Sequence, residues 1–131
     1  MTTPALLLLF NHTFTEIQSA DARRTLGVRA IIALPEDLRR IWRQIPADQP
    51  AIYGHLAPLR EWVSLTARTD DFILIQGDFG ATWLMVQFAL NRGMIPVYAT
   101  TRREAREIRL PDGATQLTHH FRHVMFRRYG C

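Results

Sequence analysis

Lysine is absent from this sequence, and all 16 basic residues are arginine. A codon bias toward arginine accounts for that choice, but the arginines are unevenly placed. Residues 1–91 hold eight arginines against nine acidic residues, whereas residues 92–131 hold eight against three. The excess positive charge therefore lies in the last third of the chain. This favours an anionic partner, with a solvated basic surface as the alternative.

Cysteine and long apolar runs are also scarce. The one cysteine, Cys131, excludes an internal disulfide and fits a reducing, cytoplasmic location. No apolar run approaches the roughly 20 residues of a membrane-spanning helix. No basic residue precedes the first run, so we expect neither a membrane partner nor a signal peptide. With 131 residues, 47% of them hydrophobic, the sequence predicts a single domain over residues 1–131.

The hydrophobic pattern alternates between strands and helices. Four short, nearly continuous apolar runs are typical of strands covered on both faces, and they are residues 5–10, 28–34, 72–76 and 95–99. Helical patterns occupy the segments between them, at residues 15–26, 35–45, 59–68 and 80–91. The first helix is expected to begin with a capping box of Thr15 and Gln18 and to end at Gly27.

The last third of the chain changes pattern. Two strand-like segments, residues 106–110 and 116–128, flank a Pro-Asp-Gly turn at 111–113, which predicts an antiparallel hairpin. The fold class predicted is therefore α/β, with a Rossmann-like, mainly parallel sheet flanked by helices and a C-terminal β-hairpin. The order of the strands cannot be read from this pattern.

Polar clusters follow three of the predicted strands. Asn11, His12 and Thr13 follow the first, residues 76–82 follow the third, and residues 100–103 follow the fourth. Each cluster alone is more readily a loop with capping residues. Because the carboxyl ends of parallel strands share one edge of a sheet, where open α/β folds bind ligands, the coincidence favours a functional site.

The glycine-containing cluster predicts a ligand contact at the start of a helix. Gly77 and Gly80 allow a ligand to approach the backbone closely. Asp78 either caps the helix or bonds a ribose or base. The Asp-Phe-Gly string is not a kinase signature, because the other kinase elements are missing.

Basic residues in the other clusters suggest anion contacts. Arg102 and Arg103 can each bind a phosphate through two N–H groups of the guanidinium. Alternatively, they are exposed arginines whose charge is balanced by neighbouring glutamates. His12 can transfer a proton near neutral pH. The string His119-His120-x-x-His123 suggests a metal site, but adjacent strand residues point to opposite faces, so we expect no metal there. A basic strand face is the preferred interpretation of this region.

Taken over nearly its whole length, the sequence resembles the small CRISPR-associated proteins of the Csx-twenty family. The longer matching strings are Leu8-Leu9-Phe10-Asn11-His12, Gln76-Gly77-Asp78-Phe79-Gly80-Ala81, Val97-Tyr98-Ala99-Thr100-Thr101-Arg102 and Phe121-Arg122-His123-Val124. The shorter ones are Gln18 with Asp21-Ala22, Leu34-Pro35, Trp42 and Phe126-Arg127.

The resemblance implies a CARF-like domain that forms a Rossmann-like homodimer. It implies a ring nuclease that binds cyclic oligoadenylate, chiefly cyclic tetra-adenylate, and linearises it to switch off type III CRISPR signalling. An RNA ring can be opened without a metal or cofactor, because a ribose 2′-hydroxyl can attack its adjacent phosphate if the protein enforces the geometry.

Strand-end geometry assigns roles within this hypothesis. His12 transfers the proton, Asn11 orients the ribose or phosphate, and Arg102 stabilises the transition state. The ligand-binding residues expected are Thr13, Gln76, Gly77, Asp78, Phe79, Gly80, Ala81, Thr100, Thr101, Arg103, His123 and Arg127.

Three other functions remain open at this point. A protein of the same fold can sequester the ring without cutting it. An unrelated nucleotide enzyme would need a dinucleotide or P-loop glycine fingerprint, and neither is present. Binding of long DNA or RNA through the basic last third is disfavoured by the nearly balanced charge of residues 1–91.

Overall fold

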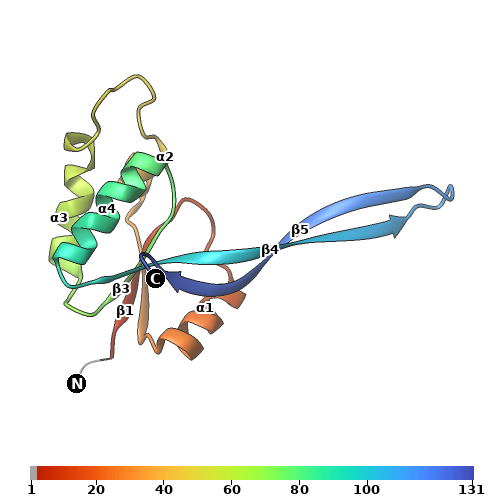
Figure 1. Cartoon of the computed structure of the whole chain (residues 1–131), viewed down its shortest axis with the longest axis horizontal. Helices are drawn as coiled ribbons and strands as arrows, with labels where there is room; N and C mark the ends of the chain where they lie inside the picture. The colour runs from red at the N-terminus through yellow and green to blue at the C-terminus, as the bar shows by residue number, and fades with distance from the viewer. Residues whose placement is uncertain (1–2) are drawn as a thin grey trace.

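The computed structural model describes residues 3–131, which form an α/β fold around a five-stranded sheet of order β2-β1-β3-β4-β5 (Figure 1). The strands are β1 (Ala5–Leu9), β2 (Ala30–Ala33), β3 (Phe72–Ile75), β4 (Ile95–Arg109) and β5 (Thr115–Arg128). The β1–β2, β1–β3 and β3–β4 pairs are parallel, whereas β4–β5 is antiparallel. The α/β class is confirmed, and the sheet is mixed rather than mainly parallel.

Helices cover both faces of the sheet. One face carries α1 (Glu16–Asp21), which continues as a π-helical segment, η1 (Ala22–Leu26). The other face carries α2 (Glu36–Arg43), a short 3₁₀ turn η2 (Gly54–Leu56), α3 (Ala57–Thr66) and α4 (Phe79–Asn91). Alternate side chains of β1 and β3 pack on opposite faces of the sheet. Leu7 and Ile73 pack on the α2–α4 face, whereas Leu6 and Leu74 pack on the face covered by α1 and η1.

The local signals at the first helix are confirmed. The Thr15 hydroxyl accepts from the Gln18 backbone N–H, and the Gln18 side chain accepts from the Thr15 backbone N–H, which completes the capping box. Gly27 has a φ of 66°, a left-handed conformation that glycine adopts without steric cost. The pattern therefore predicted both ends of the segment, but not its π-helical second half.

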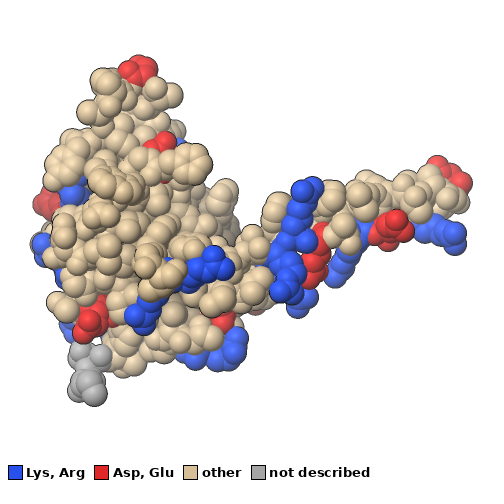
Figure 2. Space-filling view, in the orientation of Figure 1, with Lys and Arg blue, Asp and Glu red and all other residues tan. Residues whose placement is uncertain are grey.

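Strand β4 is three times longer than the sequence pattern predicts. The expectation that it ends at Ala99 is wrong, because β5 pairs with it from Val97 to Arg109. Cross-strand backbone hydrogen bonds, rather than burial of side chains, hold this polar segment extended. The outer part of the β4–β5 hairpin leaves the body as an arm, with basic and acidic side chains along it (Figures 1 and 2).

Among the residues that the structure describes, no helix has both the length and the apolar character needed to cross a membrane.

Candidate functional site

The connections that follow β1 and β3, two neighbouring strands, run in opposite directions across the sheet. From β1 the chain proceeds to β2 on one side, and from β3 it proceeds to β4 on the other. Ligands of open α/β sheets bind beyond the carboxyl ends of the strands at such a switch point. Here the loops after Leu9 and Ile75 flank it, and three hollows open around these loops and the neighbouring hairpin.

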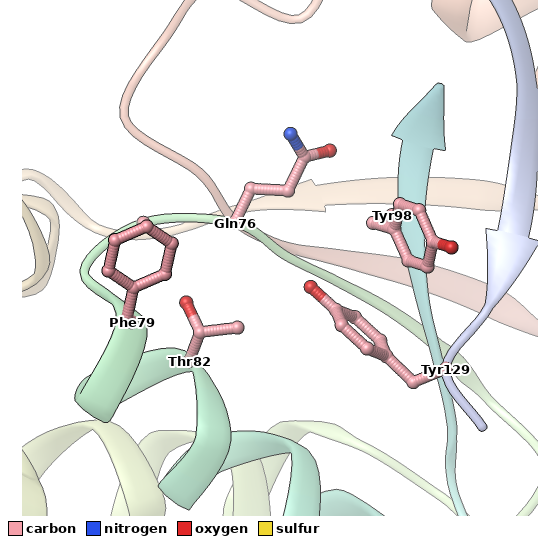
Figure 3. Close-up of a pocket in the computed structure, with 6 residues that line it drawn as sticks. Gln76, Phe79, Thr82, Tyr98 and Tyr129 are labelled. Carbon is pink, nitrogen blue, oxygen red and sulfur yellow. The ribbon is translucent and has the colours of Figure 1, made fainter.

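The first hollow, which we call the tyrosine pocket, has a volume of about 380 Å³. It lies between the start of α4 and the β4–β5 pair, as Figure 3 shows. Its lining residues are Gln76, Gly77, Phe79, Thr82, Tyr98 and Tyr129. Three of these were predicted as ligand contacts from the sequence, and Thr82, Tyr98 and Tyr129 were missed.

The two tyrosines form the wall opposite α4. Their ring centroids are 4.8 Å apart, and the Tyr129 hydroxyl donates to the Ile75 carbonyl. Burial, and then the proximity of Tyr98, raises the pKa of Tyr129. Arg127 donates to the Tyr98 hydroxyl at 3.1 Å, so its guanidinium lies beside the pocket without lining it.

The opposite wall carries Phe79, the first residue of α4, which is 95% exposed. A phenylalanine in this position contributes nothing to the core. Figure 3 shows its ring beside the Thr82 side chain, whose hydroxyl oxygen is buried and has no hydrogen-bond partner among the described residues. An aromatic face beside an unpaired hydroxyl suits a ligand that has a flat ring and polar edges.

Gln76 and Gly77 contribute to the structure at the carboxyl end of β3. The Gln76 side-chain oxygen accepts from the Ala99 backbone N–H at 2.7 Å, and its carbonyl accepts from the Trp42 indole at 2.9 Å. A Cβ at Gly77 would lie 2.9 Å from the Trp42 indole nitrogen. Glycine is therefore required here for the packing of Trp42, whereas the sequence suggested the approach of a ligand.

Asp78 is a helix cap. Its carboxylate accepts from the Ala81 backbone N–H at 3.0 Å, which is the first of the two roles considered for it. Gly80 has room for a side chain, since a Cβ there would be 3.5 Å from the nearest atom. The negative charge of Asp78 opposes phosphate at the start of α4, so the tyrosine pocket suits a base or ribose better than a phosphate.

The second hollow, the histidine hollow, has a volume of about 160 Å³ and contains His12 and Thr13 together with Arg39 of α2. His12 is exposed and stands edge-on to Phe10 at 5.5 Å. Arg39 donates to the Asn11 carbonyl at 3.3 Å. The Asn11 side-chain oxygen and the Arg39 Nε are buried without partners in the described part of the chain. Of these two residues, Arg39 lines the hollow and Asn11 lies next to it in the chain.

The predicted cluster after β4 does not exist as a loop, because its residues are inside the strand. The Thr100 hydroxyl donates to the Met125 carbonyl and accepts from the Met125 N–H, both at 3.2 Å. Arg102 and Arg103 are exposed and pair across the hairpin with Arg122 and Phe121. Neither arginine lines the tyrosine pocket or the histidine hollow.

The third hollow, the hairpin pocket, lies between α1 and the hairpin and has a volume of about 480 Å³. Thr101 and His123 line it, and His123 forms a 2.7 Å contact with Asp21. No three His, Cys, Asp or Glu side chains of residues 3–131 are grouped so as to hold a metal ion.

The predicted site residues are thus divided among three hollows, the start of α4 and the hairpin. The prediction of Ala81 as a ligand contact is wrong for its side chain, which is buried in the core. The sequence carries little signal for the missed members: Tyr129 lies beyond the last predicted strand, and Asp21 is 102 residues from its partner His123.

Sequence comparisons cover almost the whole chain. The profile of the family described as "Uncharacterized protein MJ1673 family" matches residues 4–127. The chain is similar to the protein named "Uncharacterized protein MJ1673" of Methanocaldococcus jannaschii, with 43% identity over 126 residues, or 96% of this chain and 97% of that protein. No solved structure matches.

Proposed function

We propose that this chain, which belongs to the MJ1673 family, is a homodimeric protein that binds cyclic oligoadenylate and opens the ring without a metal. The ligand is chiefly cyclic tetra-adenylate, and its removal would switch off type III CRISPR signalling. The ring specificity rests on the resemblance of the sequence to the Csx-twenty family. The capacity to bind an adenine nucleotide rests on the tyrosine pocket.

The observation that carries the nucleotide proposal is the 95% exposed Phe79 ring beside that pocket. Stacking of a base on an aromatic side chain is worth about 1–3 kcal/mol. The Gln76 amide and the unpaired Thr82 hydroxyl supply polar contacts for the edge of a base or for a ribose. The order β2-β1-β3-β4-β5 is that of flavodoxin-like doubly wound sheets, which supports a Rossmann-like, CARF-like domain.

The chemistry proposed is attack of a ribose 2′-hydroxyl on the adjacent phosphorus. The 2′-proton goes to His12, the phosphorus–O5′ bond breaks, and O5′ takes up a proton, which leaves a 2′,3′-cyclic phosphate and a 5′-hydroxyl. Asn11 orients the group and Arg102 stabilises the added negative charge. A ring of four nucleotides is larger than any one hollow, so the tyrosine pocket and the histidine hollow can contact different nucleotides of one ring.

A dimer is part of the proposal, because a two-fold protein presents the same edge to both halves of a two-fold ring. The hairpin arm carries apolar side chains outside the core: Ile108, Leu117 and Phe121 are 46%, 58% and 72% exposed. Apolar side chains on a projecting hairpin favour contact with a second copy.

The second candidate is a protein that sequesters the ring. The tyrosine pocket favours it, because no histidine, carboxylate or arginine is among the residues that line this pocket.

Binding measurements test the nucleotide part of the proposal. Cyclic tri-, tetra- and hexa-adenylate are titrated into the wild type, into Phe79→Ala and into Leu65→Ala. Leu65 is a matched control, 80% exposed on α3 and outside the pocket. We expect Phe79→Ala to raise the dissociation constant about 10-fold, the equivalent of roughly 1.4 kcal/mol, and Leu65→Ala to leave it unchanged. Equal affinities of the two variants, or a wild type that binds no ring, contradict the proposal.

A further inference from the structure

The sequence predicted His123 as a ligand contact, but the buried pair Asp21–His123 has no role in the chemical steps proposed above. The Asp21 carboxylate and the His123 Nε2 are 2.7 Å apart, and the two side chains are only 8% and 7% exposed. They come from α1 and β5, and His123 lines the hairpin pocket, which has the largest volume of the three hollows. Burial of an acidic and a basic side chain is unfavourable unless they are paired, so a buried pair such as this one points to a specific role.

A β-bulge brings His123 to this position. Thr100 pairs with Met125 but Thr101 pairs with His123, so Val124 is an extra residue. Side chains alternate along a strand, and one extra residue reverses which face they occupy. His123 therefore lies on the same face as Phe126, with the two rings 4.7 Å apart, and points toward α1 instead of away from it.

A second irregularity begins on the other side of the contact. The helix changes from α to π immediately after Asp21, over Ala22–Leu26. In this geometry Asp21 receives three further contacts: the Thr25 hydroxyl donates to its backbone carbonyl at 2.7 Å and to its Oδ1 at 3.3 Å, and Arg24 donates to Oδ1 at 3.0 Å. π-Helical turns are rare in proteins, and those that occur are often at functional sites. The carboxylate is thereby fixed in orientation.

The contact defines the tautomer of the imidazole. A carboxylate that already accepts from Arg24 and Thr25 acts as an acceptor, so His123 carries its hydrogen on Nε2. The other ring nitrogen, Nδ1, is covered and has no partner among residues 3–131. A buried polar atom without a partner is unfavourable, and a bound group that forms a hydrogen bond to it would remove that cost. A carboxylate that orients an imidazole is the arrangement of an acid–base pair.

The walls of the pocket favour an anion. Arg106, His120 and Arg122 line it against a single acidic residue, Glu104. Arg122 is 70% exposed and only 3.9 Å from Glu104, so most of its hydrogen-bonding capacity is free for a ligand. Figure 2 shows basic side chains gathered where the hairpin leaves the body. Thr101 adds a hydroxyl at the same place.

We propose that the hairpin pocket is a binding site for a phosphate group, free or esterified, and that His123, oriented by Asp21, forms a hydrogen bond through Nδ1 to that phosphate. No covalent bond changes. The imidazole contacts Asp21, which is paired with Arg24 of the same helical segment. The other charged or titratable groups of the pocket are Glu104 and Arg106 from β4 and His120 and Arg122 from β5. This site is on the α1 face, and it shares no lining residue with the tyrosine pocket.

The test is a titration of the whole protein with inorganic phosphate and, separately, with adenosine 5′-monophosphate. The ring nitrogens of ¹⁵N-labelled histidine are observed by NMR at constant pH. Phosphate should shift the Nδ1 signal of His123 in a saturable way. If only the monophosphate ester does so, the natural ligand is an ester, and if both do so equally, the phosphate alone is recognised.

Matched variants complete the test. Arg122→Gln should weaken phosphate binding about 10-fold, the value of one charge-assisted hydrogen bond. His119→Gln, on the same strand but outside the pocket, should leave it unchanged. Phe79→Ala should also leave it unchanged, which separates this site from the tyrosine pocket. Asp21→Asn should abolish the tautomer preference, with circular dichroism as the check of folding. A His123 ring that does not respond to either probe, or that responds equally in Arg122→Gln, overturns the proposal.

Discussion

The Trp42 indole donates a 2.9 Å hydrogen bond to the Gln76 carbonyl and occupies the space beside Gly77. This contact locks α2 to the carboxyl end of β3, directly below the loop that leads into α4. The position of Phe79 and of the tyrosine pocket depends on it.

Gly77→Ala is therefore expected to destabilise the fold. Its Cβ would lie 2.9–3.0 Å from three atoms of the buried Trp42 ring, and overpacking of this kind costs about 1–3 kcal/mol. Gly80→Ala is the control, because a Cβ fits there and alanine is the better helix former by about 0.5–1 kcal/mol. Urea denaturation should give a lower free energy of unfolding for the first variant and an equal or higher one for the second. A neutral Gly77→Ala contradicts the assigned role of Trp42.

The raised pKa of Tyr129 predicts that the protein loses stability at alkaline pH. Its pKa in the folded protein is raised above the ordinary value of 10.0, by burial first and by Tyr98 second. The folded state then holds the proton more tightly than the unfolded state, so this contribution is complete below about pH 10 and is lost as the pH rises through the folded pKa. No lysine titrates in this range.

Tyr129→Phe should be less stable than the wild type at pH 7 by about 1 kcal/mol, because the Ile75 carbonyl loses its donor. The difference should shrink as the pH is raised above 10. Denaturation at several pH values measures it, and Tyr53→Phe, at an exposed site, serves as the control. A constant difference across this range would show that the hydroxyl does not titrate as described.

Substitutions of Asp78 separate capping from ligand contact. Asp78→Ala removes the cap of α4 and should cost about 1 kcal/mol of unfolding free energy. Asp78→Asn keeps an acceptor but removes the negative charge, so stability should change little. Affinity for cyclic tetra-adenylate should then rise about 2- to 5-fold, since a charge at a helix start is worth roughly 0.3–1 kcal/mol. Loss of ring binding in Asp78→Asn would instead mean that the carboxylate bonds the ligand.

Shortening the hairpin tests the dimer. Replacing residues 103–121 with Asn-Gly joins the facing residues Arg102 and Arg122 by a two-residue turn. Most of the removed side chains are exposed, so the free energy of unfolding should stay within about 1 kcal/mol of the wild type. Light scattering after size-exclusion chromatography should report a dimer for the wild type and a monomer for the variant. A variant that remains dimeric places the interface elsewhere.

Strands β1 and β3 and the capping box of α1 were predictable because each depends on a local pattern. The extension of β4 was not, since polar residues exposed on both faces of a hairpin leave no hydrophobic periodicity. Gly77 illustrates another limit: the sequence shows that a side chain is excluded but not what excludes it.

The candidate site was predicted in part, for a similar reason. Gln76, Gly77 and Phe79 follow a recognisable strand and do meet in one pocket. The partnership of His123 with Asp21 depends on a one-residue bulge at Val124, and a shift of one residue reverses the face on which a side chain lies.

The measurement that tests the central claim most directly is a single-turnover incubation of the wild type with labelled cyclic tetra-adenylate, with and without EDTA, followed by chromatography of the products. We expect linear products with 2′,3′-cyclic phosphate and 5′-hydroxyl ends, formed at the same rate in both samples and strongly slowed in His12→Ala and Arg102→Ala. A ring that binds but stays intact supports sequestration, and a ring that neither binds nor opens contradicts the account.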